Sequence, residues 1–186
     1  MPTWPEISRS IYGTWRLAHA DTGGMNYFDL SFGGFWRSFG AAVVALPLYV
    51  YFVAVTFDGT DVSLTVFIIV KALTYTVGWI ALPVVMIGLA PLLGLSSRYI
   101  DFIIVTNWGS VLRSALFLPI NTLAGFGNAS TGFGATLYLA TMAAALAYQW
   151  FITRTSLQTN NITATGLVVV DLLLGLLVVI LFGRLL

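Results

Sequence analysis

The sequence predicts an all-α integral membrane protein, a five-transmembrane-helix bundle with an N-terminal interfacial amphipathic helix. Two features of the composition point to this class. Of the 186 residues, 59% are hydrophobic and only 8% are charged, whereas a soluble domain carries about 25% charged residues. The mean hydropathy is +0.93. The third observation is that apolar stretches long enough to cross a hydrocarbon core of about 30 Å recur along the chain.

Residues 1–24 are predicted to form an amphipathic segment on the cytoplasmic side of the membrane. Thr3 and Glu6 have the spacing of a capping box, which predicts the start of a helix. Apolar side chains then follow at steps of three and four residues, at Trp4, Ile7, Ile11, Trp15 and Ala18. Such a stripe suits a helix whose tryptophans lie among lipid headgroups. The alternative is an ordinary helix packed under the bundle.

Residues 25–186 are predicted to form a single transmembrane domain. Its five spans are expected at about 35–57, 62–92, 99–123, 133–152 and 162–182. The second span is too long for one straight crossing, so Pro83 and Pro91 are expected to bend or break it. Short loops join the spans, including an acidic turn at 57–61 and a glycine-rich loop at 125–132.

The start of the first span is rich in aromatic residues. Asp29 or Ser31 can cap the helix that enters the membrane. The aromatic side chains on one face of that helix are Phe32, Phe35, Trp36 and Phe39. This is the pattern of an interfacial aromatic belt. Together with Asp29, these aromatic residues are candidates for contacts at the membrane interface.

The fourth span offers a second candidate contact surface, made of alanines. Ala140 with Ala144, and Ala143 with Ala147, are pairs of small residues four positions apart. Pairs with this spacing let two membrane helices approach each other closely.

The positions of the arginines predict the orientation of the chain. Arginines occur in the N-terminal segment and in the second and fourth loops, at Arg9, Arg16, Arg37, Arg98 and Arg154. The first and third loops contain no lysine or arginine. By the positive-inside rule the N-terminus is cytoplasmic and, after five spans, the C-terminus lies on the opposite side. The brevity of the chain and its loops favours a bacterial inner membrane.

Three charged residues lie deep within the predicted spans, away from the span ends. Lys71, the only lysine, and Asp171 each lie nine residues from the start of their span, roughly 14 Å deep at 1.5 Å per residue. Both therefore lie near the middle of a core about 30 Å thick. Arg113 lies 14 residues into the third span, roughly 21 Å from the cytoplasmic end. A charge at such depth requires a partner or a water-filled pocket.

Two interpretations of this intramembrane charged cluster are open. In the first, Asp171 neutralises Lys71 or Arg113 and joins the helices as a structural ion pair. In the second, Asp171 is a protonatable group on a polar pathway, and Lys71 or Arg113 modulates it. The sequence favours the structural pair, because the chain shows no internal repeat of the kind typical of transporters.

The residue inventory argues against several functions. The chain has no cysteine and a single histidine, His19, so we expect no metal site, catalytic residue or cofactor. No nucleophile elbow, phosphate loop or dinucleotide fingerprint occurs. The net charge of +1 gives no reason to expect a nucleic-acid partner.

The start of the first span also matches a family signature. The matching residues are Asp29, Leu30, Gly33 or Gly34, Phe35 and Trp36. This segment resembles the first span of the Yip family, small five-span membrane proteins with a cytoplasmic N-terminus. The chain departs from that signature by one inserted residue and by Gly34 in place of a proline. The resemblance implies the five-span fold and a bacterial-type small membrane protein, a group in which most members have no assigned activity.

The function that the sequence favours is that of a non-enzymatic membrane scaffold or accessory subunit. Its expected partners are the lipid bilayer and either other membrane subunits or further copies of the chain. The alternative is a small oligomeric channel or carrier that uses Lys71, Arg113 and Asp171.

Overall fold

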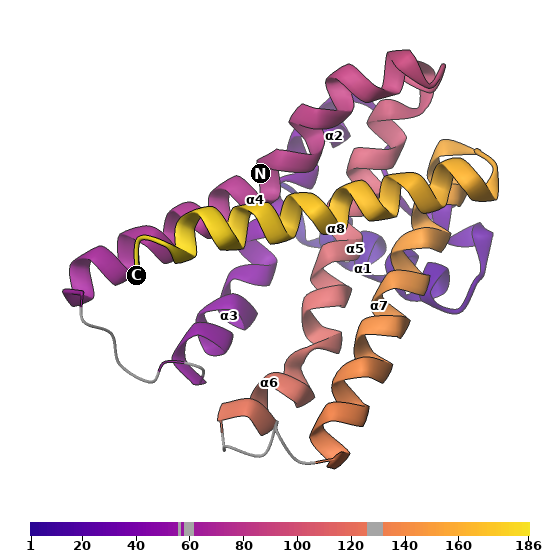
Figure 1. Ribbon diagram of the computed structural model, residues 1–186. Coiled ribbons are helices and arrows are strands. Elements are labelled where there is room, and N and C mark those ends of the chain that lie inside the picture. The colour runs from indigo at the N-terminus through magenta and orange to yellow at the C-terminus, as the bar shows by residue number, and fades with distance from the viewer. Residues whose placement is uncertain (56, 58–61, 126–131) are drawn as a thin grey trace.

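The computed structural model describes residues 1–55, 57, 62–125 and 132–186. Within these ranges the chain is helical, with two 3₁₀ segments and no strand (Figure 1). The elements in order are α1 (Trp4–Ala18), η1 (Thr22–Tyr27), α2 (Phe32–Ser38), α3 (Gly40–Val55), α4 (Leu64–Leu92), η2 (Ser96–Arg98), α5 (Tyr99–Leu116), α6 (Leu118–Gly125), α7 (Gly132–Leu157) and α8 (Asn161–Gly183). Most of the predicted acidic turn and the interior of the predicted glycine-rich loop lie outside the described residues.

Five helical segments of the described chain are long and apolar enough to cross a membrane. They are Phe32–Val55, Leu64–Leu92, Ser96–Leu123, Gly132–Leu157 and Asn161–Gly183. With α1 preceding them, the predicted all-α fold with five spans and an N-terminal helix is confirmed. The predicted boundary between residues 24 and 25 falls inside η1, which packs against α1.

The helix breaks differ from those expected at the prolines. Of the two alternatives predicted for the second span, a bend or a break, the break is wrong, because α4 continues as one helix through Pro83 and Pro91. Instead, the third span divides at Phe117 into α5 and α6. Pro119 lies in the first turn of α6, where its missing N–H would have had no helical acceptor.

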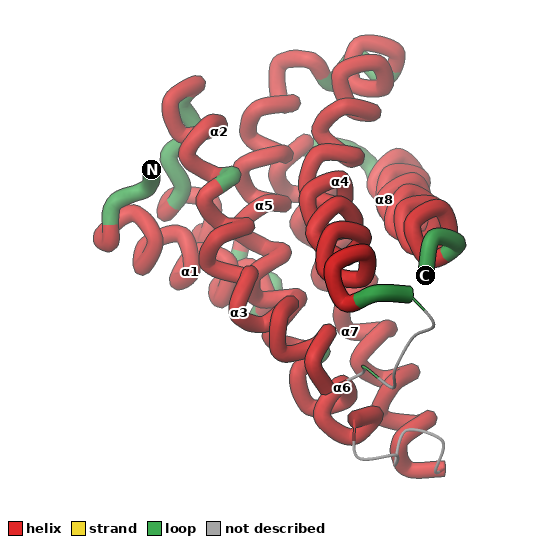
Figure 2. The backbone as a smooth tube through the Cα atoms, turned by 90° about the vertical axis from the view of Figure 1, so that its left-hand side faces the viewer, coloured by secondary structure: helices red, strands yellow, loops and turns green. Residues whose placement is uncertain are grey.

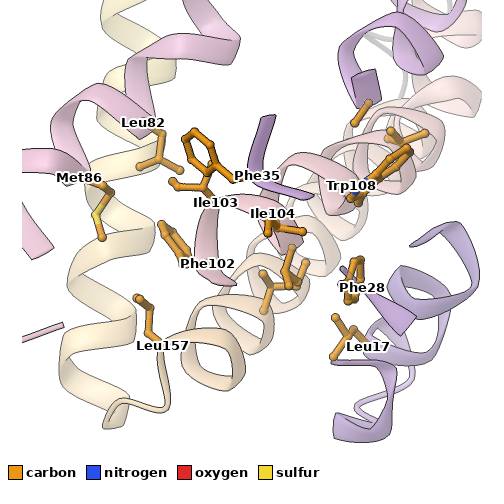
Figure 3. Close-up of a cluster of buried hydrophobic side chains, with 14 of the residues drawn as sticks. Leu17, Phe28, Phe35, Leu82, Met86, Phe102, Ile103, Ile104, Trp108 and Leu157 are labelled. Carbon is orange, nitrogen blue, oxygen red and sulfur yellow. The ribbon is translucent and has the colours of Figure 1, made fainter. Parts of the chain in front are cut away.

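The central element of the bundle is α5. All residues from Phe102 to Gly109 are buried, because α5 packs against α1, α2, α3, α4 and α7. Figure 3 shows part of the resulting apolar cluster, in which Phe102, Ile103 and Trp108 lie with buried side chains from α1, α2, α3, α4, α7 and α8. Gly109 permits a close approach to α7, since a Cβ there would lie 2.6 Å from the side chain of Ile152.

Packing is concentrated at the end of the bundle where α4 ends and α5 and α8 begin. In α8 the buried residues of the first half are Ala164, Leu167 and Val168, whereas most of residues 172–186 are exposed. Away from this end, the antiparallel pair of α4 and α8 diverges from α3, α5 and α7 (Figures 1 and 2). The fold is therefore compact at one end and splayed at the other.

Helix α1 combines the two alternatives predicted for it. Its face toward the bundle is made of small and polar residues with one leucine, at Glu6, Ser10, Gly13, Thr14 and Leu17. Its tryptophans, Trp4 and Trp15, are exposed. The helix thus packs on the bundle with one face and leaves its aromatic stripe free for lipid, as expected of an interfacial helix.

The N-cap of α1 differs from the predicted capping box. Thr3 is the N-cap residue, but its side chain makes no capping hydrogen bond. The carboxylate of Glu6 instead accepts from Nε of Arg37, at 3.0 and 2.9 Å to its two oxygens. A guanidinium is the stronger partner for a carboxylate, because both groups are charged.

At the start of α2 the backbone makes a tight turn, in which two of its segments come close together. Ser31 is the N-cap, and its hydroxyl accepts from the backbone N–H of Gly34 at 3.0 Å. Asp29 lies two residues before this N-cap and accepts from the backbone N–H of Ser31 at 3.0 Å. A Cβ on Gly34 would overlap the backbone carbonyl oxygen of Asp29. Only glycine fits at this position.

We predict that Gly34→Ala destabilises the protein by at least ~2 kcal/mol, because the new methyl group forces the turn away from α2. The measurement is thermal unfolding in detergent, followed by tryptophan fluorescence. Gly88→Ala is the control, since a Cβ on Gly88 in α4 meets no atom within 4 Å. Equal loss of stability in the two variants would contradict this account of the turn.

Candidate intramembrane binding site

Arg113 and Asp171 form an ion pair between α5 and α8. Nη1 of Arg113 lies 3.2 Å from Oδ2 of Asp171, and their side chains are 27% and 22% exposed. Arg113, rather than Lys71, is therefore the base that pairs with Asp171. The pair is only partly enclosed, so its stabilising effect is smaller than that of a fully buried pair.

The guanidinium of Arg113 is the centre of a larger polar network. Nη1 also donates to Oε1 of Gln149 on α7 at 2.9 Å. Nη2 donates to the hydroxyl of Ser110, one turn earlier in α5, at 2.9 Å. Arg113 thus connects α5, α7 and α8 through charge-assisted hydrogen bonds. Sequence reasoning missed Gln149, although a glutamine within an apolar span is a signal of this kind.

Lys71 lies apart from this network. Its Nζ lies over the ring of Phe67, 5.3 Å from the centroid, and makes no ion pair with any described acid. The backbone carbonyl of Lys71 accepts from the hydroxyl of Tyr49 at 2.9 Å. Lys71 is seven residues into α4 from Leu64, so its flexible side chain can extend along the helix toward that end. The predicted charged cluster therefore consists of two residues, with Lys71 separate.

A cleft opens beside the Arg113–Asp171 pair, between α3, α4 and α5. We call it the α3 cleft; its volume is about 530 Å³. Its polar wall is a stripe on α5, formed by Thr106, Asn107, Ser110, Arg113 and Ser114. The spacing of these residues puts them on one helical face. The opposite walls are largely aromatic, with Tyr49 and Phe52 from α3 and Tyr75 and Trp79 from α4.

A second cleft of about 500 Å³ lies between α4, α7 and α8, and we call it the α7 cleft. Its lining is mostly aliphatic and includes Met142, Ala145, Val168 and Leu172, together with Gln149. The two clefts share five lining residues, which are Gly78, Leu82, Arg113, Phe117 and Asp171. The ion pair thus stands at the wall between the clefts and is accessible from both.

The predicted interfacial residues separate into an inner and an outer group. Phe35 is 8% exposed and belongs to the core, where its ring packs against those of Phe39 and Tyr99. Phe32 and Trp36 are 66% and 63% exposed. Only these two form an outward aromatic surface on α2.

Asp29 belongs to an ionic cluster rather than to that surface. Its carboxylate pairs with Nη2 of Arg37, and Nε of the same arginine binds Glu6. Hydrogen bonds from Ser31, reinforced by the charge of Arg37, lower the pKa of Asp29 from its ordinary value. The cluster ties α1 to the start of α2. Sequence reasoning did not connect these residues, because Glu6 and Arg37 are 31 positions apart.

Among the described residues, no three His, Cys, Asp or Glu side chains gather where they could hold a metal ion. The paired Arg113 and Asp171 are complementary charges, flanked by hydroxyl and amide groups. Such an arrangement can hold helices together or present a polar group to a ligand.

Comparisons with protein families, with curated proteins and with solved structures find no match for this chain. Its function is therefore argued from its own residues.

A double-mutant cycle will test the structural role of the pair. We expect Arg113→Gln and Asp171→Asn each to lower the free energy of unfolding by about 1–3 kcal/mol, because each leaves a partner charge uncompensated. The double variant should lose less than the sum of the two single losses. The quantity measured is unfolding by denaturant in micelles.

Lys71→Met is the control for this cycle. Because Lys71 lies outside the network, the change in unfolding free energy caused by Lys71→Met should add to the change caused by Asp171→Asn. Strong coupling between Lys71 and Asp171, with none between Arg113 and Asp171, would contradict the assigned pairing.

Proposed function

We propose that the protein is a non-enzymatic membrane scaffold or accessory subunit that acts through helix contacts within the membrane. The observation that carries this proposal is the outward alanine face of α7. Ala140, Ala143, Ala144 and Ala147 are all exposed, whereas α7 packs on the bundle through a different face that includes Ala145 and Ile152. Small residues at this spacing favour close helix approach, and the described chain supplies no helix there.

The splayed end of the fold supports the same proposal. Beyond the packed end, α4 and α8 expose long aliphatic surfaces, for example at Ile68, Leu73, Leu176 and Ile180. Lipid chains can cover such surfaces, and so can a partner helix or a second copy of the chain.

A small oligomeric channel or carrier is the second candidate function. The observation that favours it is that two clefts meet at the Arg113–Asp171 pair. A charged pair accessible from two sides inside a membrane is a feature of solute and proton pathways. Lys71 lines neither cleft, so in this alternative Arg113 and Asp171 would carry the activity.

We further propose a cytoplasmic N-terminus, a C-terminus on the opposite side and location in a bacterial inner membrane. The arginine distribution supports this orientation. The hydrogen bond of 2.9 Å between Arg98 and Gln158 joins the second and fourth loops at one end of the bundle, so the arginines of these two loops lie on the same side. A relationship to the Yip-type proteins stays part of the proposal and is supported by the segment from Asp29 to Trp36.

Reporter fusions test the orientation. We expect a reporter fused after Leu186 to be active only on the non-cytoplasmic side, and one fused before Met1 to be active only in the cytoplasm. A cytoplasmic signal from the fusion after Leu186 would overturn the proposed topology.

Purification from native membranes tests the scaffold proposal. The tagged protein should copurify in fixed stoichiometry with another membrane protein or with a second copy of itself. Ala144→Leu should abolish this association while leaving the unfolding temperature unchanged, because the larger side chain blocks helix approach on an exposed face. Ala135→Leu, on another exposed face of α7, is the matched control and should retain the partner.

Flux measurements separate the two candidate functions. The purified protein in liposomes should move neither protons nor ions if it is a scaffold. Flux that is abolished by Asp171→Asn, with expression and oligomeric state intact, would reject the scaffold and establish the carrier.

A further inference from the structure

The guanidinium of Arg113 retains hydrogen-bonding capacity. A guanidinium carries five N–H donors, and the structure gives those of Arg113 three acceptors, Gln149, Asp171 and Ser110. The Nε–H and one Nη2–H have no acceptor within the described chain. Since the side chain lines both clefts and is partly exposed, these donors are accessible to another group.

Two buried polar atoms near Arg113 also lack a partner among the described residues. They are Oγ1 of Thr106, a residue of the α3 cleft, and Nε2 of Gln149, a residue of the α7 cleft; both atoms are enclosed by the protein. Leaving such an atom unsatisfied is unfavourable. The amide of Gln149 cannot be reversed, because Arg113 has donors only and requires Oε1. The site therefore has a surplus of donors and suits a group rich in acceptor oxygens.

The walls of the α3 cleft indicate what kind of group could lie beside the acceptor oxygens. The rings of Tyr49 and Tyr75 lie 4.5 Å apart between centroids, and Trp79 lies 6.1 Å from Tyr75. The hydroxyls of both tyrosines already donate to backbone carbonyls, at Lys71 and Ala42. What they present to the cleft is mainly ring surface. A volume of about 530 Å³ lies in the range of small-molecule sites, roughly 300–1,000 Å³.

We propose that the α3 cleft binds an amphiphile with an anionic headgroup, a phosphate or a carboxylate. The headgroup accepts from the free donors of Arg113, and the apolar chain lies against the aromatic wall of α3 and α4. Asp171 repels the headgroup and competes with it for the guanidinium. The site goes beyond the scaffold function and does not depend on it, because it uses the inward face of α5 rather than the outward face of α7.

Ligand titrations of the purified full chain in neutral detergent test this proposal. The probes are dioleoylphosphatidylglycerol, oleate, dioleoylphosphatidylcholine and inorganic phosphate, and binding is followed by native mass spectrometry. At least one of the two anionic amphiphiles should bind at 1:1 stoichiometry, at least tenfold more tightly than phosphatidylcholine. Preference for phosphatidylglycerol identifies a phospholipid as the source of the headgroup, and preference for oleate identifies a fatty acid.

Variants locate the binding in the α3 cleft. Arg113→Gln should weaken binding at least tenfold, because it removes the charged donors. Asp171→Asn should tighten binding severalfold, because it removes the repulsion and releases the guanidinium. Lys71→Gln is the matched control: it removes the other intramembrane cation but should leave affinity unchanged, since Lys71 lines neither cleft.

Several outcomes would overturn the proposal. One is an equal loss of affinity in Lys71→Gln and Arg113→Gln, which would indicate non-specific attraction to positive charge. Others are weaker binding in Asp171→Asn, or inorganic phosphate binding as tightly as the amphiphiles. If Arg113→Gln does not fold, the tighter binding predicted for Asp171→Asn, compared with the unchanged affinity of Lys71→Gln, decides the result.

Discussion

The polar face of α5 is the constraint on which the rest of the structure depends. In a bilayer, polar and charged side chains must find partners within the protein. Helix α5 carries such residues for more than two turns, from Thr106 to Ser114, and the other helices are arranged around them. Gln149 from α7 and Asp171 from α8 reach Arg113, and Ser38 at the end of α2 accepts from Asn107 at 2.9 Å. One guanidinium thereby unites helices that are far apart in the chain.

The same constraint explains why the bundle is compact at one end and splayed at the other. From Phe102 to Gly109, α5 is buried among apolar side chains of neighbouring helices (Figure 3). Further along, its polar stripe lines the α3 cleft, and α4 and α8 diverge there from α5 and α7 (Figure 1). The two clefts are the result, and the ion pair stands between them. The site and the shape of the fold therefore have one cause.

The N-terminal region is held to the bundle by a separate set of contacts. Arg37 binds both Glu6 and Asp29, and the buried Phe28 packs close to Gly13 of α1. These contacts fix α1 beside the first span while its tryptophans stay exposed. The segment that resembles the Yip signature thus has a local physical role. It forms the turn and cap that start α2, and the close approach at Gly34 accounts for the glycine.

The amino-acid sequence by itself determined the class of the fold, the number of spans and the charged residues inside the membrane. These follow from local properties, namely the length of apolar runs and the isolation of Arg113 and Asp171 within them. Only the tertiary structure decided which base meets Asp171, that Gln149 joins them, and that Phe35 is buried while Trp36 is exposed. The boundaries of a span predict how deep a charged side chain lies in the membrane. The rotation and crossing angles of the helices decide which side chains are its neighbours. Those depend on packing between residues distant in the chain, and for that reason Lys71, at a similar predicted depth, lies outside the site.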